Sequence, residues 1–164
     1  MRNKKVAFLA QAAMIGALYV ALVCIFAPIS FGAIQFRIAE ALTILPVFTP
    51  AAIPGLFVGC VLGNILGGAA PLDVVFGSLA TLIGAFFTWT LRNAHPFLAP
   101  VPPILANTLI IPFVLRYAYG IPDSIPFLML TVCIGEVIAC GLLGLLLYYA
   151  LRKSKTYIFR SHES

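Results

Sequence analysis

Charged residues are scarce in this sequence. Only 9% of its 164 residues are charged, whereas a soluble domain carries about 25%. So few charges cannot cover a water-facing surface, which excludes a soluble enzyme, a disordered tail and a nucleic-acid-binding domain. Hydrophobic residues make up 62% of the chain, and the mean hydropathy is +1.09. These values are typical of a membrane protein.

Several catalytic and metal-binding motifs are also absent. No lysine lies between Val6 and Leu151, so the chain has no phosphate-binding Walker loop. Its histidines are His95 and His162, and it has no Gly-x-Ser-x-Gly or Cys-x-x-Cys motif. We therefore expect no enzyme, no cofactor and no metal site. The cysteines lie in apolar stretches and are expected to be small buried side chains: Cys24, Cys60, Cys133 and Cys140.

Proline and glycine divide the apolar sequence into six candidate membrane-spanning helices. The predicted segments cover residues 6–27, 36–48, 51–68, 72–91, 103–117 and 125–151. The second is short and contains Pro46, which favours a tilted or partly re-entrant helix. Because each crossing needs about 20 apolar residues, we expect residues 1–164 to form a single all-α integral membrane domain with short loops.

The distribution of positive charge predicts that both termini are cytoplasmic, because cytoplasmic segments collect Lys and Arg. With six crossings, both basic ends and the loop containing Arg92 lie on one side and carry eight positive charges. Only Arg37 and Arg116 lie on the other side. Three loops then gather on the outer face: residues 28–35, 67–71 and 118–126.

Small residues recur at every fourth position in two segments, a spacing that lets helix backbones approach closely in lipid. In the third segment they are glycines, and packing inside the bundle is the favoured interpretation: Gly55, Gly59, Gly63 and Gly67. In the first segment they are alanines, and internal packing and docking of another subunit stay open as alternatives: Ala13, Ala17 and Ala21.

Polar residues within the apolar segments are the candidates for function. An ionisable group at membrane depth is costly, and it usually faces the bundle interior or a water-filled cavity. The candidates are the charged residues Arg37, Glu40, Asp73, Arg116 and Glu136, with the amides Gln35, Asn64 and Asn107. We expect Arg37 and Glu40 near the outer surface, with Asn107 and Glu136 deeper. Most of this polarity falls in the outer half of the bundle, which predicts a pocket open to the outside.

Structural interpretations compete with these functional ones. Arg37 and Glu40 could form an ion pair, Asp73 could cap a helix, and the two asparagines could bond across helices. Arg116 is expected to extend toward lipid headgroups. For Glu40 and Glu136 a functional role is favoured. Glu136 in particular has no basic residue in its own segment and must find a hydrogen-bond donor or stay protonated.

The stretch from Gln35 to Leu82, the sequence VPPILANTLIIP at 101–112 and the Gly135–Glu136 pair together resemble the queuosine-precursor transporter (QueT) family. Its members are substrate-binding S components of energy-coupling factor (ECF) transporters. The resemblance covers nearly the whole chain, with Ala39 standing where serine is more usual. It implies a six-helix S-component fold in the plasma membrane. It also implies two kinds of partner, a transmembrane coupling subunit and two ABC ATPases.

The resemblance further implies import of a 7-deazaguanine base, namely queuine, preQ1 or preQ0. In that case Glu40 or Glu136 accepts the N–H donors of the base edge. Asp73 pairs with a ligand ammonium, and an asparagine donates to the carbonyl. The other expected contacts are Arg37 and three aromatic residues that stack on the ring, Phe36, Phe76 and Tyr117. The alanines of the first helix would dock the coupling subunit. An S component for another vitamin and a membrane scaffold that transports nothing stay open as alternatives.

Overall fold

The computed structural model describes residues 4–30 and 36–153, and every regular element within them is a helix. In chain order these are α1 (Lys4–Ile25), α2 (Ala27–Ser30), η1 (Ile38–Val47), α3 (Ala52–Leu66), α4 (Pro71–Thr90), η2 (Pro96–Leu98), α5 (Val101–Tyr117), α6 (Ile125–Glu136), η3 (Val137–Leu143) and α7 (Gly144–Arg152). The predicted all-α class is confirmed for these residues. Most predicted helix ends agree within two or three residues. Arg2, Lys155, Arg160 and His162 lie outside the described residues.

The second predicted segment is a 3-10 helix, η1, which is shorter than expected. A 3-10 helix rises about 2.0 Å per residue, so ten residues extend about 20 Å, whereas the hydrocarbon core is about 30 Å thick. Pro46 lies at the penultimate position of η1. Proline lacks a backbone N–H and cannot continue a helical ladder, which agrees with the helix ending at Val47.

The last predicted segment forms one continuous helical rod, Ile125–Arg152. Its middle part, η3, is π-helical over seven residues, a feature that the sequence pattern did not indicate. A π-helical turn widens the backbone locally and is frequently found at functional sites. Glu136 immediately precedes this turn, and Cys140 lies within it.

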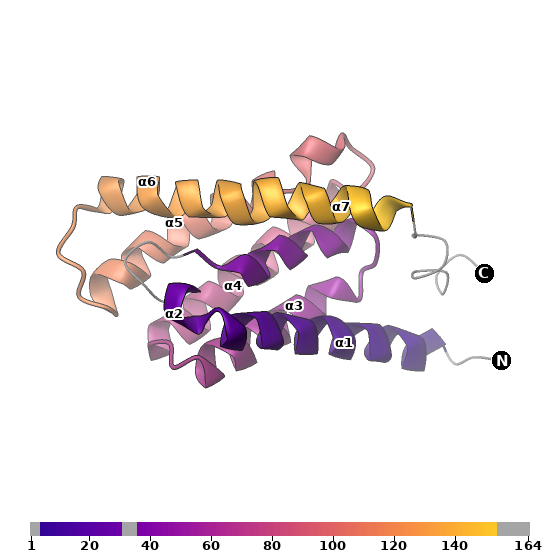
Figure 1. The fold of residues 1–164 in the computed structure, drawn as a ribbon, viewed down its shortest axis with the longest axis horizontal. Helices are drawn as coiled ribbons and strands as arrows, with labels where there is room; N and C mark the ends of the chain where they lie inside the picture. The colour runs from indigo at the N-terminus through magenta and orange to yellow at the C-terminus, as the bar shows by residue number, and fades with distance from the viewer. Residues whose placement is uncertain (1–3, 31–35, 154–164) are drawn as a thin grey trace.

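The elements pack as a bundle around η1 (Figure 1). α1 packs on α3, α3 on α4, α4 on α5, and α5 on α6, while η1 contacts α1, α3, α4, η3 and α7. In Figure 1 the start of α1 and the end of α7 lie at the same end of the bundle.

Glycines of α3 form the contact with α1. A Cβ at Gly55 would lie 2.6 Å from the Ala12 carbonyl oxygen, and one at Gly59 would lie 2.9 Å from the Gly16 carbonyl oxygen. No side chain fits at such distances, so these glycines bring the two backbones together, which confirms the internal-packing interpretation. The alanine series of α1 (Ala13, Ala17 and Ala21) lies on the exposed part of the same helix.

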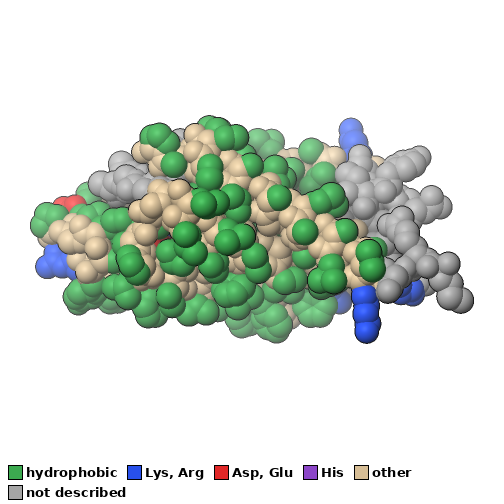
Figure 2. Space-filling view, turned by 90° about the horizontal axis from the view of Figure 1, so that it is seen from below, with side chains coloured by type: hydrophobic (Ala, Val, Ile, Leu, Met, Phe, Trp, Pro, Cys, Tyr) green, Lys and Arg blue, Asp and Glu red, His purple; other side chains and the backbone are tan. Residues whose placement is uncertain are grey.

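The bundle has the surface of a membrane protein. Four helical stretches are long and apolar enough to cross a bilayer: Lys4–Ile25, Pro71–Thr90, Pro96–Tyr117 and Ile125–Arg152. The other two, η1 and α3, are apolar but shorter. On the face shown in Figure 2, basic side chains appear only near the two ends, and hydrophobic side chains cover much of the stretch between them.

The cysteines are only partly as expected. All four are free thiols, and Cys60 and Cys140 are buried. Cys24 is exposed and Cys133 is partly buried, so the prediction of four buried cysteines is wrong. Cys24 lies near the end of α1, where that helix presents apolar side chains outward, Ile25 among them.

Candidate functional site

A cluster of buried polar side chains lies inside the bundle, and every long element contributes to it. Its members, which we call the polar cluster, are Tyr19, Arg37, Glu40, Thr43, Cys60, Asn64, Asp73, Thr81, Asn107, Glu136 and Cys140. None of them is more than 4% exposed. Of the eight polar residues singled out from the sequence, six belong to this cluster, whereas Arg116 is exposed and Gln35 lies outside the described residues. Burying so many polar groups is costly unless they are hydrogen-bonded, so their partners decide what the cluster can do.

Glu40 of η1 is held by donors from three helices. The Tyr19 hydroxyl of α1 and the Thr81 hydroxyl of α4 both donate to Glu40 Oε1, the latter at 3.1 Å. Asn107 of α5 donates to Glu40 Oε2 over a longer distance, 3.5 Å. One carboxylate oxygen is therefore well satisfied by the protein, whereas the other has a single weak donor among the residues that the structure describes.

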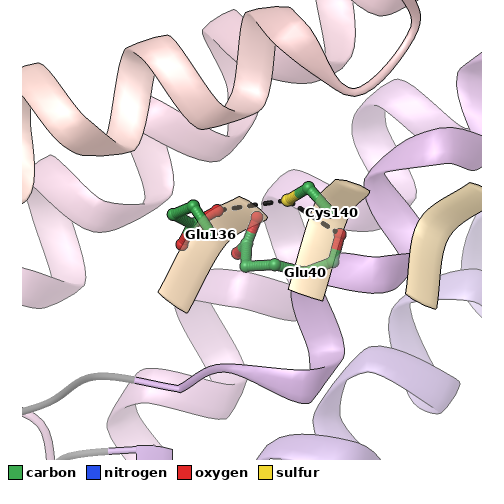
Figure 3. Close-up of side chains that lie close together, drawn as sticks. All are labelled: Glu40, Glu136 and Cys140. Carbon is green, nitrogen blue, oxygen red and sulfur yellow. Dashed lines mark hydrogen bonds between the residues drawn. The ribbon is translucent and has the colours of Figure 1, made fainter. Parts of the chain in front are cut away.

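Glu136 faces Glu40 from the α6–α7 rod. The Cys140 thiol donates to Glu136 Oε2 at 3.1 Å, and Asn107 is also adjacent. Atoms of Glu40, Glu136 and Cys140 that could ligate a cation all lie within 4.8 Å of one another (Figure 3). From the sequence we expected Glu40 near the outer surface and Glu136 deeper. That separation is wrong, because η1 lies within the bundle and brings Glu40 beside Glu136.

Arg37 and Asp73 form a buried ion pair between η1 and α4. Arg37 Nη2 lies 2.5 Å from Asp73 Oδ2, and the two side chains are 5% and 0% exposed. The alternative of an Arg37–Glu40 ion pair is therefore wrong, because Asp73 pairs with the guanidinium instead. The alternative of Asp73 as a helix cap is wrong as well. Ala70 is the N-cap of α4 and no side chain caps this end, although Asp73 lies in the first turn, where a negative charge is favourable.

Asp73 has two further features. Its Oδ2 accepts a hydrogen bond from the Tyr119 hydroxyl at 2.9 Å, and that hydroxyl accepts one from the Ala70 N–H at 3.2 Å. Asp73 Oδ1 has no hydrogen-bond partner among the described residues. Half-burial of Tyr119 and the nearby negative charge of Asp73 raise the pKa of the phenol to about 12. Tyr119 therefore stays a neutral donor at physiological pH.

Both asparagines bond across helices, as the structural interpretation predicts. Asn64 of α3 donates to the Asp73 carbonyl oxygen at 3.3 Å, and Asn107 bonds to Glu40 as described above. Arg116 is exposed, and its contact with lipid headgroups stays a prediction. It donates to the carbonyl oxygens of Pro122 and Asp123 at 2.6 and 3.0 Å and so closes the loop after α5.

Comparison with known proteins decides the family. Residues 9–153 match the sequence profile of the family described as QueT transporter, which is most of the chain. The chain belongs to the QueT transporter family.

One curated relative is the "Queuosine precursor transporter QueT" of Lactococcus lactis subsp. cremoris (strain MG1363), which is 34% identical over 85 residues. The match covers 51% of this chain and 50% of that protein, so the chain spans about half the length of this curated relative. No solved structure matches the chain significantly. The family assignment thus confirms the resemblance seen in the sequence.

The aromatic residues expected to stack on a ligand do not join the polar cluster of this QueT family member. Phe76 and Tyr117 are 44% and 72% exposed and lie on the outside of the bundle. Phe36, which precedes Arg37, is partly buried. The stacking role of these three residues stays a prediction, and only Phe36 is adjacent in sequence to a member of the cluster.

Sequence reasoning missed several members of the cluster. Tyr19, Thr81 and Cys140 bond directly to Glu40 or Glu136, and Tyr119 bonds to Asp73. For Tyr19 a signal was present, since it lies three residues after Gly16, on the face of α1 that contacts α3. Thr81 lies eight residues after Asp73, two turns along the same face of α4. Cys140 looked like an apolar residue because nothing in the sequence indicated the π-helical turn.

Proposed function

We propose that this chain is the substrate-binding S component of an ECF-type importer that takes up a 7-deazaguanine queuosine precursor across the plasma membrane. Family membership supports a role in membrane transport, and the name of the Lactococcus relative supports the substrate class. The observation that carries the proposal is the polar cluster. Ionisable groups within a membrane bundle are expensive and typically mark ligand pathways.

The chemistry of the cluster suits such a ligand. The edge of a guanine-like base presents adjacent N–H donors, which a carboxylate accepts in bidentate fashion. Glu40 and Glu136 lie side by side as candidate acceptors, while Asn64 and Asn107 offer amide donors for a carbonyl group. A ligand that left such acceptors unpaired would be strongly disfavoured.

The proposed arrangement has six membrane segments with cytoplasmic termini, a coupling subunit and two ABC ATPases. The common end reached by α1 and α7 supports an even number of crossings (Figure 1). On α1, the exposed alanines offer a flat face on which another helix can pack closely. In that arrangement Ala17→Trp blocks recovery of the coupling subunit on co-purification and leaves ligand binding intact. Normal recovery would contradict the docking role.

A binding measurement with the purified protein in detergent tests the proposed substrate. Wild-type protein should bind 7-deazaguanine bases but not riboflavin, biotin or thiamine. Glu40→Gln and Glu136→Gln should each weaken binding of preQ1 at least about tenfold, or about 1.4 kcal/mol. Asp123→Asn is the matched control, since it removes an exposed carboxylate in the loop after α5.

Two outcomes would contradict the proposal. Preference for one of the vitamins would assign the chain to another S component. Absence of any ligand-induced thermal stabilisation would favour a membrane scaffold, a role with which the protein-derived donors on Glu40 are compatible.

A further inference from the structure

The buried charges of the bundle do not balance. Among the described residues, Arg37 is the only buried basic side chain, whereas three acids are buried: Glu40, Asp73 and Glu136. The Arg37–Asp73 ion pair uses the single positive charge. Glu40 and Glu136 are left facing each other without a basic partner. Two adjacent carboxylates in apolar surroundings cannot both stay ionised without a compensating positive charge.

Hydrogen bonding shows the same imbalance, because the atoms with too few partners are acceptors. Glu40 Oε2 has one donor at 3.5 Å, and Glu136 has the weak thiol donor of Cys140 with Asn107 adjacent. Independently of these two acids, Asp73 Oδ1 is fully buried and has no donor among the described residues. A native protein rarely leaves a buried acceptor unsatisfied. An incoming molecule that completes the cluster must therefore bring donors.

The acceptors are linked through α4. Asp73 and Thr81 lie on the same face of α4, and Thr81 bonds to Glu40. At the Glu136 end, oxygen atoms of Glu40 and Glu136 and the sulfur of Cys140 converge within 4.8 Å (Figure 3). An ammonium group has three N–H donors and one positive charge, which suits the carboxylate oxygens of two uncompensated acids, while the Cys140 thiol already donates to Glu136.

From these observations we propose that the Glu40–Glu136 pair is the subsite for a positively charged amine of the ligand, and that Glu136 is the residue that selects it. This inference rests on the proposed function and refines it. Tyr19 and Thr81 fix Glu40 in place, so Glu40 orients the subsite. Glu136 has no comparable hydroxyl donors among the described residues and provides the carboxylate that meets the amine.

The refinement also changes the expected role of Asp73. From the sequence we expected Asp73 to bind the ammonium, but the negative charge of Asp73 is neutralised by Arg37 at 2.5 Å. Asp73 Oδ1 retains an acceptor for a neutral N–H group, while the amine goes to the unpaired acids. Among the queuosine precursors, the site then favours those with an aminomethyl group over the nitrile. A primary amine is protonated at neutral pH, as a lysine side chain is, and a nitrile is uncharged.

Isothermal titration of the purified full-length protein with preQ1 and preQ0 tests the inference, because these two bases differ in the aminomethyl and nitrile substituents. Wild-type protein should bind preQ1 at least about tenfold more tightly than preQ0, or about 1.4 kcal/mol. Glu136→Gln should remove this preference by weakening preQ1 alone and leave preQ0 binding nearly unchanged. The control Asp123→Asn should keep the wild-type preference.

The outcomes separate this inference from the proposed function. Equal wild-type affinity for preQ1 and preQ0 would overturn the inference and leave the proposed function standing, with the two acids neutralised by a proton. If Glu136→Gln weakened the binding of preQ1 and preQ0 equally, the inference would also be overturned, because Glu136 would then bind the base edge that both ligands share. No binding of either base would overturn the proposed function itself. Thermal stabilisation by Zn²⁺ or Mn²⁺ alone, reversed by a chelator and lost in Glu136→Gln, would assign the pair to a metal ion instead.

Discussion

Gly77 of α4 lies against the polar cluster with no free space for a side chain. A Cβ at this residue would lie 2.6 Å from Asp73 Oδ1, 3.2 Å from Arg37 Nη1 and 3.4 Å from Asn64 Nδ2. The first distance is shorter than real Cβ atoms allow. The single methyl group of Gly77→Ala must therefore displace the Asp73 carboxylate, and with it the buried ion pair.

The expected cost follows from three effects. Replacing glycine by alanine within a helix stabilises by about 1 kcal/mol. Overpacking a close contact costs about 1–3 kcal/mol, and breaking a buried ion pair costs about 3–5 kcal/mol. Because the Asp73 side chain can turn while keeping part of its contact with Arg37, only a fraction of the last value applies. We expect Gly77→Ala to lower the free energy of unfolding by about 2 kcal/mol.

Thermal unfolding of the purified protein in detergent measures this effect. Gly141→Ala is the matched control, because its Cβ would meet nothing closer than Val137 Cγ1 at 3.8 Å. The control should melt at or above the wild-type temperature, whereas Gly77→Ala should melt below it and bind the ligand more weakly. Wild-type stability of Gly77→Ala would refute the reasoning, since the ion pair would then have moved aside at no cost.

Further variants test other contacts of the bundle. Gly59→Ala places a Cβ 2.9 Å from both the Gly16 carbonyl oxygen and Tyr19 Cβ. Measured by thermal unfolding, it should lower the free energy of unfolding by about 1–3 kcal/mol. An unchanged melting temperature would contradict the close contact of α1 and α3. Tyr19→Phe removes a hydrogen-bond donor to Glu40 and should lower the free energy of unfolding by about 1–3 kcal/mol. Circular dichroism should show that the helices are retained. An unchanged free energy of unfolding would mean that another donor replaces the hydroxyl. The pKa of Tyr119 is raised to about 12 from 10, so the folded state favours the neutral phenol. The contribution of this phenol to the free energy of unfolding is therefore present below pH 10 and lost as pH rises through 12. The free energy of unfolding, measured between pH 10 and 12, should fall less for Tyr119→Phe than for the wild type. Equal falls would show that Tyr119 is not the cause.

The fold was predictable where the sequence carries a local signal. Long apolar runs bounded by proline and glycine predicted α1, α4, α5 and the Ile125–Arg152 rod, because length and hydropathy are properties of the segment itself. The glycine spacing of α3 also predicted its close packing. The 3-10 form of η1 and the π-helical turn η3 were not predictable in this way. Both depend on what the neighbouring helices offer, and the local sequence around each is simply apolar.

The members of the polar cluster were predictable, but their pairing was not. Arg37, Glu40 and Asp73 stand out in an apolar chain because a charge at membrane depth is rare. The acid that pairs with the Arg37 guanidinium is decided by the relative position of η1 and α4. Spacing along the chain instead favoured Glu40, which is only three residues away. The structure instead joins Arg37 to Asp73, 36 residues away. This pairing leaves Glu40 and Glu136 without a basic partner.

The 3-10 form of η1 has a direct consequence for the polar cluster. Arg37, Glu40 and Thr43 are spaced by three residues. In an α-helix with 3.6 residues per turn, each such step turns by about 60°, whereas in a 3-10 helix these positions are aligned. Glu40 and Thr43 can therefore bond to Thr81 and Cys140 from one row of side chains, while Arg37, which precedes η1 in an extended conformation, pairs with Asp73.

Runs of 3-10 helix beyond three or four residues are uncommon, because their hydrogen bonds are poorly aligned. The ten-residue run of η1 must therefore be held by contacts outside itself. The ion pair at Arg37 and the donors on Glu40 are such contacts, and they reach η1 from α4, α1 and α5. A ligand amine that binds between Glu40 and Glu136 would act on this same row of side chains. The backbone form of η1 is then the structural property that ligand binding is best placed to change.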